Sequence, residues 1–362
     1  MINILVISNY SNSLSSRPEA EIFLSLDKTR FQLTVMTDEH TEYAEKFRES
    51  GIKVIHYIPF RKVSKKEIDF IRNEVKDGKY DIVHVFTGKA IINCILAVRK
   101  LKTKLLLYRG YTGNIHWYDP LAYLKYLHPR VDGIICNSTS VKLSIDHNNL
   151  FSKRKTVVIT KGHDPSWYTN VSPADIHSLG VKKGSYVFIT SGNARKMKGF
   201  RYLLKAIDML PEDADIQLII AGGDENFITK FSRKLHENKE KVIFAGYRKD
   251  LLSVVAACDA FISSSVKGES FNKSLAEAIM LGKPAIITGI EGNKGMVIHE
   301  KTGLIVPARN ARALADAMLQ FYHHPEKSAL LGIEGKAHLS QNYSFHSTVR
   351  QYEDYYTSLI DK

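Results

Sequence analysis

The sequence predicts an α/β protein made of two doubly wound domains in tandem, each with a mostly parallel sheet. Three observations support this prediction. Short apolar, β-branched runs alternate with longer segments of helical spacing, which is typical of βαβ units. The chain has 362 residues, too many for one ordinary core. The alternation breaks at residues 161–174, where Gly, Pro, Asn and Ser mark a linker.

The expected strands follow one another along both halves of the chain. In the first half they are INILVIS (2–8), FQLTVMT (31–37), DIVHVF (81–86), KLLLYR (104–109), GIICNS (133–138) and TVVIT (156–160). In the second half they are YVFITSG (186–192), DIQLIIAG (215–222), KVIFAG (241–246), AFISSS (260–265), PAIIT (284–288) and GLIVP (303–307). With the linker as boundary, the first domain covers residues 1–165 and the second covers 166–343. Ligands of such sheets bind outside the carboxyl ends of the strands.

The composition excludes several classes of protein. Apolar residues make up 44% of the chain, and no apolar run is long enough to cross a membrane. The start, MINILVISNY, lacks the basic segment and cleavage site of a signal peptide. Cys94, Cys136 and Cys258 lie in apolar runs, so we expect them to be buried and reduced, as in a cytoplasmic protein. No Cys and His spacing suggests zinc.

The net charge of +13 is distributed unevenly. Residues 1–160 carry 25 Lys and Arg against 16 Asp and Glu, net +9, and residues 161–362 carry 26 against 22, net +4. The clusters are RKVSKK (61–66), VRKLKTK (98–104) and FSKRK (151–155). A basic domain attracts anionic lipid, nucleic acid or phosphorylated substrates, although a solvated surface explains the charge equally well. No aromatic-rich strand pattern accompanies the clusters, so no nucleic-acid partner is expected.

The stretch ESFNKSLAE (269–277) places two glutamates around a helix start. A loop follows the strand AFISSS, and FNKSLAEAIML (271–281) has helical spacing until Gly282 stops it. Ser270 or Asn272 is the expected N-cap. The first amides of such a helix form an anion site, and two flanking carboxylates suit a ribose and a sugar. This describes a nucleotide sugar, although two ordinary surface acids remain the alternative.

A basic loop supports the first interpretation. TSGNARKMKGF (190–200) begins at a strand end, and Arg195, Lys196 and Lys198 precede a helix that begins near Gly199. A departing diphosphate develops negative charge that fixed cations stabilise. Taken alone, the loop would be read as a basic surface.

These segments resemble the nucleotide-sugar-binding domain of the family-4 retaining glycosyltransferases. That family has the GT-B fold, in which two Rossmann-like domains face each other across a cleft. ESFNKSLAE matches the spacing of the family's motif, a Glu, seven residues and a second Glu. The flanking stretches match in order, namely KVIFAGYRKDLLSVVAACDAFISSS (241–265), AIMLGKPAIITG (278–289) and EGNKGMVIHEKTGLIVPARNARALADAM (291–318). The resemblance covers nearly all of residues 185–320.

The resemblance implies a role for each matched residue. Glu277 is expected to bind the donor ribose, Glu269 to contact the donor sugar, and Lys198 to hold the diphosphate. Gly246 and Tyr247 lie where the family's loop reads the base. The expected donor-binding residues are Gly192, Asn193, Gly246, Tyr247, Ser270, Phe271, Asn272, Lys273 and Glu277.

The chain departs from the family at Asn193, where an Arg usually stands five residues before the Lys. Arg195 is our candidate for that missing charge.

The first domain offers fewer candidates. The loop after the first strand, SNYSNSLSSRPEAEIF (8–23), lacks the glycines common in the family. Within it Ser15, Ser16 and Arg17 are candidates for contacting the acceptor, and Pro18 suits the first turn of the next helix.

The segment 105–138 supplies candidates for the donor sugar, against which the family often places a His. Here Arg109 follows a strand and His116 is the nearest histidine, and a structural role fits either residue equally well. His84 lies inside a strand and is expected in the core. Asp119, before Pro120, is expected to start a helix.

The resemblance therefore implies a retaining glycosyltransferase, a hexosyltransferase that takes its sugar from a nucleoside diphosphate sugar, with UDP favoured. The catalytic candidates are Glu269, Arg195, Lys198, Arg109 and His116. The acceptor would be a saccharide or lipid-linked hydroxyl in cell-surface polysaccharide, lipopolysaccharide or glycolipid synthesis. No cofactor or metal is expected. We expect a cytoplasmic location, with peripheral membrane contact through the basic first domain, and a terminal helix (344–362) that crosses back to that domain.

Other functions remain open at this stage. A nucleotide-sugar epimerase shares the architecture and would change its sugar nucleotide without an acceptor. A noncatalytic GT-B partner subunit would bind a donor without turnover. A polyanion-binding protein would bind nucleic acid with a steep dependence on salt.

Overall fold

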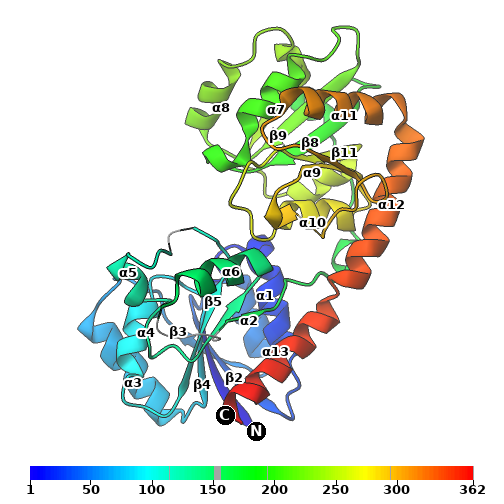
Figure 1. Cartoon of the computed structure of the whole chain (residues 1–362). Coiled ribbons are helices and arrows are strands. Elements are labelled where there is room, and N and C mark those ends of the chain that lie inside the picture. The colour runs from blue at the N-terminus through cyan, green and yellow to red at the C-terminus, as the bar shows by residue number, and fades with distance from the viewer. Residues whose placement is uncertain (114, 151–155, 194, 294, 362) are drawn as a thin grey trace. The chain divides into compact units, whose positions relative to one another are not determined.

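The computed structural model of the chain describes residues 1–113, 115–150, 156–193, 195–293 and 295–361. The basic cluster FSKRK (151–155) lies outside these residues. The chain forms two compact units (Figure 1): the first comprises Met1–Gly162 with Phe345–Lys362, and the second comprises His163–Ser344. Each unit contains one parallel sheet with helices packed on it, so the predicted α/β, Rossmann-like fold class is confirmed.

The first unit contains a seven-stranded sheet of order β3-β2-β1-β4-β5-β6-β7. Its strands are β1 (Ile2–Ile7), β2 (Phe31–Thr37), β3 (Lys53–His56), β4 (Ile82–Val85), β5 (Lys104–Arg109), β6 (Gly133–Cys136) and β7 (Thr156–Val158). Its helices are α1 (Ser13–Ser25), α2 (Glu42–Glu49), α3 (Lys65–Asp77), α4 (Ile91–Ala97), α5 (Pro120–Tyr123), α6 (Thr139–Asn148) and α13 (Phe345–Ile360).

The second unit contains a six-stranded sheet of order β10-β9-β8-β11-β12-β13. Its strands are β8 (Tyr186–Ser191), β9 (Ile216–Ala221), β10 (Val242–Gly246), β11 (Ala260–Ser263), β12 (Ala285–Thr288) and β13 (Leu304–Val306). Its α-helices are α7 (Phe200–Ile207), α8 (Glu225–Ser232), α9 (Leu251–Ala257), α10 (Lys273–Met280), α11 (Ala311–His323) and α12 (Pro325–Asn342). A short 3-10 helix, η3 (Lys196–Lys198), precedes α7.

The central strands of each sheet are largely apolar and buried, as expected for parallel sheets that helices cover on both faces. Strand β9, for example, is buried at every residue. Its one polar side chain, Gln217, is satisfied: Oε1 accepts the N–H of Lys182 at 2.6 Å, and Nε2 donates to the carbonyl of Glu240 at 3.4 Å. Burial of such a side chain is inexpensive only when its polar atoms are paired.

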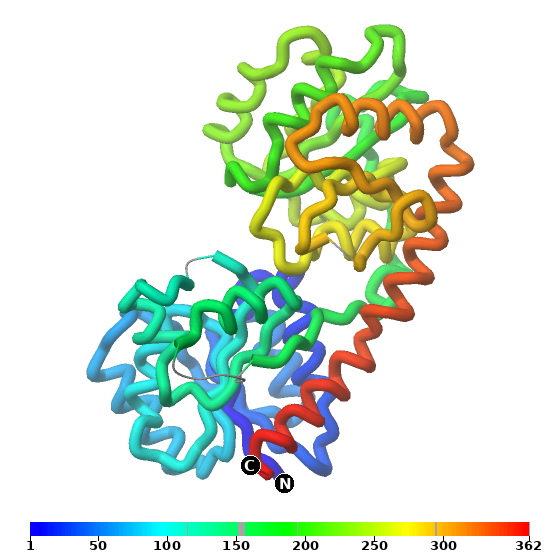
Figure 2. The backbone as a smooth tube through the Cα atoms, viewed as in Figure 1, coloured from blue at the N-terminus to red at the C-terminus, as the bar shows by residue number. Residues whose placement is uncertain are grey.

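The C-terminal helix α13 packs on the first unit beside α1, and Figure 2 shows the two chain ends close together there. The ring of His84, buried in β4, is hydrogen-bonded through Nδ1 to the hydroxyl of Tyr356, with the two atoms 2.8 Å apart. The ring of Phe23 lies edge-on to that of Tyr352, with centroids 6.4 Å apart. His84 is therefore a core residue, as the sequence predicted.

All the predicted strands are present among the described residues, but the sequence analysis missed β3. This strand has only four residues, lies at the sheet edge and exposes both of its ends, so it lacks the apolar run that marked the others. The three cysteines are buried and free, as predicted. Within the described ranges, no helix is long and apolar enough to cross a membrane.

Candidate functional site

The strand order of the second sheet creates a place for a ligand. From β8 the chain continues to β9 and β10 on one side, whereas β11, β12 and β13 extend the sheet on the other side. Neighbouring strands whose connections run to opposite faces leave a crevice at the carboxyl edge of the sheet. Residues 192–193 and 195–199 after β8 and residues 264–272 after β11 leave the sheet at this switch point.

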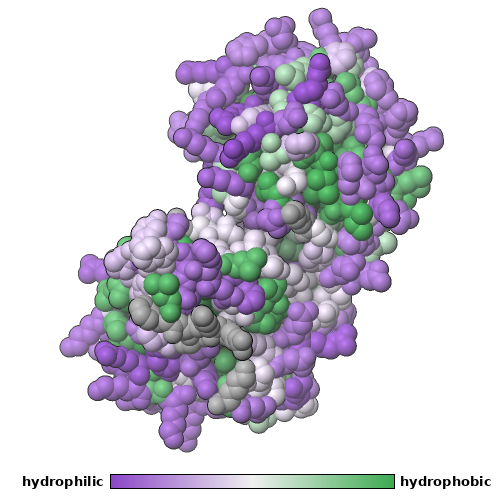
Figure 3. All heavy atoms as spheres, in the orientation of Figure 1, coloured by the Kyte–Doolittle hydropathy of each residue, from purple (hydrophilic) through white to green (hydrophobic). Residues whose placement is uncertain are grey.

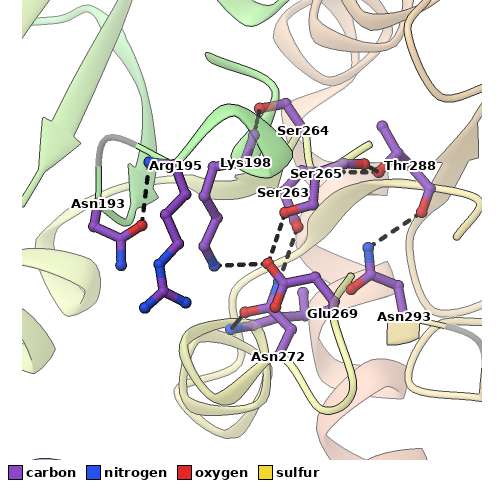
Figure 4. Close-up of polar contacts among 11 residues, drawn as sticks. Asn193, Arg195, Lys198, Ser263, Ser264, Ser265, Glu269, Asn272, Thr288 and Asn293 are labelled. Atoms are coloured by element: carbon purple, nitrogen blue, oxygen red, sulfur yellow. Dashed lines mark hydrogen bonds and ion pairs between the residues drawn. The ribbon is translucent and has the colours of Figure 1, made fainter. Parts of the chain in front are cut away.

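An ion pair joins these two loops. Nζ of Lys198 lies 2.7 Å from Oε1 of Glu269. Only 21% and 10% of the two side chains are exposed, so water screens this pair less than a surface pair. Oγ of Ser265 donates a further hydrogen bond of 2.8 Å to the same carboxylate oxygen (Figure 4). The structure thus brings together the residues that the sequence assigned to the diphosphate and to the donor sugar.

A glycine allows the two loops to approach so closely. Gly199 has a φ of +70°, and a Cβ at this position would lie 1.9 Å from the carbonyl oxygen of Ser264. Oγ of Ser264 donates to the carbonyl of Lys198 at 2.9 Å, and the N–H of Val266 donates to the carbonyl of Met197 at 2.7 Å. These contacts fix the backbone from which Lys198 reaches Glu269.

The loop after β8 presents its other polar residues to solvent. Asn193 is exposed, and its Oδ1 accepts the N–H of Arg195 at 3.3 Å. The exposed Arg195 side chain points the same way as that of Lys198 in Figure 4. Gly192 packs beneath Lys198, because a Cβ there would lie 3.4 Å from the lysine side chain. Arg195 therefore lies in the same loop as the pair, but outside the crevice contacts.

Helix α10 begins beside this ion pair. Of the two expected caps, Asn272 is the one observed: Oδ1 accepts the N–H of Leu275 at 3.3 Å, and Nδ2 donates to Oγ of Ser263 at 2.9 Å. The amides at the start of α10 lie at the carboxyl edge of β11, where the helix dipole favours an anion. One turn further on, the buried carboxylate of Glu277 forms an i,i+4 ion pair with Lys273.

A polar floor beneath the ion pair was not assigned from the sequence. Oγ1 of Thr288 donates to the carbonyl of Ser265, and Nδ2 of Asn293 donates to the carbonyl of Thr288 at 3.2 Å. Thr288 and Asn293 are fully buried. The serine run that ends β11 was the available signal, but the partners of these serines come from residues far along the chain.

The expected base-binding residues lie along the same sheet edge. Gly246 ends β10, two strands from β8, and has a φ of +61°. Its carbonyl accepts the N–H of Gly222, which follows β9, at 2.5 Å. The next residue, Tyr247, exposes 65% of its surface. The sheet edge therefore carries the candidates for base, diphosphate and sugar in strand order.

In the first unit, Arg109 supports its own loop. Its Nε donates to the carbonyl of Tyr111 at 2.7 Å, and its Nη2 donates to the carbonyl of Gly113. The guanidinium also lies over the ring of Tyr126, 4.6 Å from its centroid. His116 is exposed and stacks on Tyr118 with ring centroids 5.1 Å apart. Asp119 caps α5, as predicted.

The acceptor candidates were expected in a loop, but the structure places them in a helix. Helix α1 begins at Ser13, so Ser15, Ser16 and Arg17 lie in its first turns and Pro18 lies inside it. The reason is Asn12, whose Oδ1 caps the helix by accepting the N–H of Ser15 at 2.9 Å. Ser15 is exposed, Ser16 is buried, and Arg17 is half-buried beside Tyr43.

Two titratable residues near one another in the first unit, the buried Glu19 and the half-buried Lys161, also escaped the sequence analysis. Glu19 accepts a hydrogen bond from Oγ of Ser8 at 2.5 Å. Burial raises the pKa of its carboxyl, an effect that the nearby Lys161 amine partly opposes. Burial likewise lowers the pKa of Lys161, whose Nζ lies 5.0 Å from the ring centroid of Tyr108. A separation of 142 positions hides the proximity of these two residues in the sequence.

Among the residues that the structure describes, no group of three or more His, Cys, Asp or Glu side chains is placed to hold an ion.

Two family models match the chain. The model described as Glycosyl transferases group 1 matches residues 171–338, and the model described as Glycosyltransferase Family 4 matches residues 21–167. Together they span most of both units.

Individual relatives and structures agree with these matches. D-rhamnosyltransferase WbpZ of Pseudomonas aeruginosa is 25% identical over 81% of this chain and 74% of its own length. An Escherichia coli enzyme, UDP-Gal:alpha-D-GlcNAc-diphosphoundecaprenol alpha-1,3-galactosyltransferase, is 23% identical over 68% of this chain and 67% of its own. The structure of Anabaena Alr3699/HepE with UDP covers 99% of this chain and 100% of that one, with 17% identity and a TM-score of 0.78. This structural similarity shows that the chain has the GT-B fold.

Proposed function

Because the chain belongs to the group 1 and family 4 glycosyltransferases, we propose that it is a retaining hexosyltransferase that uses a nucleoside diphosphate sugar, with UDP favoured. The observation that carries this proposal is the Lys198–Glu269 pair at the switch point of the second sheet. A cation suits the diphosphate and a carboxylate suits sugar hydroxyls, and in this chain the two groups are in contact. The match to a UDP-bound protein supports the choice of base.

We place the donor along the carboxyl edge of the second sheet. The diphosphate meets the first amides of α10 and Lys198, and Arg195 supplies charge in place of the Arg that Asn193 replaces. The ribose hydroxyls bond to Glu277, which Lys273 holds in position. The base lies toward Gly246 and Tyr247. This arrangement follows the strand order β10-β9-β8-β11 from base to sugar.

The reaction then proceeds without a protein nucleophile. The bond between the anomeric carbon and the phosphate oxygen breaks, and the diphosphate leaves with the electron pair. Lys198 and the amides of α10 stabilise the developing negative charge, because they are already oriented toward it. The acceptor oxygen forms the new bond on the face that the diphosphate vacates, and its proton passes to the departing phosphate oxygen. The configuration is thereby retained, and no metal or other cofactor takes part in this scheme.

Glu269 acts as a positioning residue in this scheme as well as a sugar contact. Its Oε1 receives hydrogen bonds from both Lys198 and Ser265. These two bonds orient the carboxylate, and the carboxylate in turn orients the ammonium group of Lys198. When the donor binds, the diphosphate replaces part of this pairing as the partner of Lys198. A pre-oriented cation lowers the cost of meeting the new charge.

We propose that the acceptor is a lipid-linked saccharide and that the first unit docks on an anionic membrane at the cytoplasmic face. Seven apolar side chains are at least half exposed in two segments, namely Ile58, Phe60, Val63, Trp117, Tyr118, Leu121 and Leu124. Burial and the charge of nearby Lys62 lower the pKa of Lys125, so the two segments adjoin through cations. Aromatic rings suit the bilayer interface, and cations suit anionic headgroups.

Figure 3 shows hydrophobic side chains exposed between hydrophilic ones on the first unit. A lipid-linked acceptor is also consistent with the diphosphoundecaprenol named for the Escherichia coli relative.

The direct test combines donor binding with product analysis. The purified full chain is titrated calorimetrically with UDP-glucose, UDP-galactose, UDP-N-acetylglucosamine and GDP-mannose, and the donor that binds is then incubated with lipid-linked saccharide acceptors. We expect one donor to bind selectively and NMR to show the donor's anomeric configuration in the product. An inverted product would contradict the retaining mechanism. A changed sugar nucleotide without acceptor would identify an epimerase, and donor binding without turnover would identify a partner subunit.

A further inference from the structure

The second unit contains a basic pocket beside the donor contacts proposed above, with which it shares Arg195 alone. Its volume is about 260 Å³. The cations lining it come from several segments of the unit: Arg195 and Lys196 before α7, Arg201 on α7, Lys230 and Lys234 on and after α8, and Lys267 and Arg309 in two loops. The apolar lining consists of Met197, Phe200, Phe231 and Val266. Both aromatic rings are buried, so they form an apolar floor inside a rim of positive charge.

This rim of cations has no acidic counterpart. No Asp or Glu lines the pocket, and within the described ranges none of its seven basic residues forms an ion pair with a carboxylate. Other cations of the same unit are paired, as Lys273 is with Glu277 and Arg248 is with Asp250. Glu269, two positions after Lys267, pairs with Lys198 instead. Like charges gathered without counter-charges repel one another, and a bound anion relieves that repulsion.

Two of the cations are held by aromatic rings rather than by acids. The guanidinium of Arg201 lies 4.5 Å from the ring centroid of Tyr202, and its Nη2 donates to the hydroxyl of the same tyrosine at 2.5 Å. Nζ of Lys230 lies 5.9 Å from the ring centroid of Phe231. These contacts orient the cations without neutralising them. The pocket therefore keeps its positive charge.

We propose that this pocket binds an organic phosphate, a small ligand with at least two negative charges and an apolar portion. The charges would meet the cationic rim, and the apolar portion would cover Phe200 and Phe231. A pocket of about 260 Å³ suits a headgroup-sized ligand and not a stretch of polymer. The shared chemistry, a phosphate ester, occurs both in soluble metabolites and in lipid headgroups.

The pocket is separate from the donor crevice but shares its loops. Lys198 lines a different cavity, together with Ser263, Ser265 and Asn272. Arg195, Lys196 and Met197 precede Lys198 in one loop, and Val266 and Lys267 precede Glu269 in the other. The N–H of Val266 bonds to the carbonyl of Met197 at 2.7 Å. A ligand in the pocket would therefore contact both loops that carry the Lys198–Glu269 pair.

The test uses the full chain with saturating UDP present, so that phosphate probes do not report on the donor site. Glycerol 3-phosphate is titrated calorimetrically as the soluble probe. Vesicles of phosphatidylglycerol in phosphatidylcholine, compared with phosphatidylcholine alone, are the lipid probe in co-sedimentation. The pocket variant is Lys230→Ala with Lys234→Ala. The matched control is Lys327→Ala with Lys336→Ala. These two exposed lysines lie in α12, and their removal changes the net charge by the same amount as the pocket variant.

We expect at least one probe to bind the wild type, the pocket variant to bind it at least tenfold more weakly, and the control to stay within twofold. The charge reversal Lys230→Glu alone should weaken binding in the same way, which guards against a folding defect in the double variant. Which probe responds identifies the source of the phosphate. The proposal fails if neither probe binds or if the control loses as much affinity as the pocket variant. Because sugar transfer is not measured, these outcomes are independent of the proposed catalytic function.

Discussion

The ring of Phe271 lies stacked on the ring of His163, with centroids 5.9 Å apart and an interplanar angle of 17°. The ring of Tyr343 approaches Phe271 from another direction, with centroids 6.0 Å apart. His163 and Tyr343 lie where the chain enters and leaves the second unit, and the N–H of His163 donates to the carbonyl of Tyr343 at 2.9 Å. Phe271, the residue before the Asn272 cap, therefore contacts both ends of the second unit's segment.

This anchoring predicts that Phe271→Leu weakens donor binding, although leucine keeps an apolar side chain. The lost aromatic contacts are worth about 0.5–1.5 kcal/mol, and the start of α10 would be held less firmly. Calorimetric titration with the preferred UDP sugar measures the effect. Phe70→Leu, a partly exposed aromatic in α3 of the first unit, is the control. Equal donor affinity in wild type and Phe271→Leu would show that the anchor has no part in donor binding.

Replacing Lys198 with methionine should lower kcat by about 10²–10³, because the cation acts on charge that develops in the transition state. The effect should exceed any change in KM for the donor. Lys205→Met, an exposed lysine on α7, removes the same charge elsewhere on the unit and should leave the rate nearly unchanged. Steady-state kinetics with the identified donor and acceptor provide the measurement. A rise in KM with unchanged kcat would instead assign Lys198 to ground-state binding.

Glu277→Ala should weaken donor binding by about 1–3 kcal/mol, roughly 5- to 150-fold, through loss of the ribose hydrogen bonds. The donor sugar should not influence the size of this loss, because every donor carries the ribose. Titrations with UDP and with the UDP sugar therefore should show the same ratio of variant to wild-type affinity. If only the UDP sugar lost affinity, Glu277 would be assigned to the donor sugar and not to the ribose.

Substituting the exposed rings of the first unit should release it from membranes. Phe60→Ser with Trp117→Ser removes two large side chains, 77% and 55% exposed, that pack little in the fold. Co-sedimentation with phosphatidylglycerol vesicles should fall several-fold, whereas donor binding in the second unit should be unchanged. Leu330→Ser with Ile333→Ser, which removes two apolar side chains of α12 in the second unit, each 61% exposed, is the matched control. Undiminished sedimentation of the double variant would rule out this surface as the docking site.

His84 predicts a loss of stability in mild acid. Burial lowers the pKa of its imidazole well below the usual 6.5. Above pH 6.5 neither state carries the proton, and as the pH falls below that value the unfolded state binds it first. The free energy of unfolding of the first unit should therefore fall by up to about 1.4 kcal/mol per pH unit until the folded pKa is reached.

The chain allows this loss to be measured in one unit. Hydrogen exchange of peptides from β4 and α13, followed by mass spectrometry, reports on unfolding of the first unit alone. Urea unfolding between pH 5 and 7.5, with and without His84→Gln, isolates the contribution of this residue. His40→Gln, at an exposed position, is the control. A His84→Gln variant with the same pH slope as the wild type would exclude His84 as the source.

Periodicity predicted much of this fold because parallel strands covered on both faces carry continuous apolar runs. Exposed β3 lacks such a run and was missed. The start of α1 was misplaced for a different reason: Pro18 was read as a first-turn residue, whereas the Asn12 cap starts the helix at Ser13 and leaves the proline inside it. The local signal for α1, the Asn12 cap, was present but was outweighed by the proline, whereas β3 carried no comparable signal.

The candidate site could be predicted where its residues share a loop or a helix turn. The glutamates of ESFNKSLAE and the cap at Asn272 are of this kind. The pairing of Lys198 with Glu269 depends on β8 and β11 being neighbours in the sheet, which the order of strands in the sequence does not state. Glu19 and Lys161, from opposite ends of the first unit's main segment, were missed for the same reason.

The packing of α13 on the first unit has a consequence for the order of events during synthesis. Tyr352 and Tyr356 complete the aromatic core around Phe23 and His84, yet the ribosome makes them only after the whole of the second unit. The second unit is continuous and can close while translation is under way. The first unit begins to emerge earlier, but the part of its core that α13 covers remains exposed until residues 345–360 are released. The part of the protein that is made first is therefore the last to finish folding.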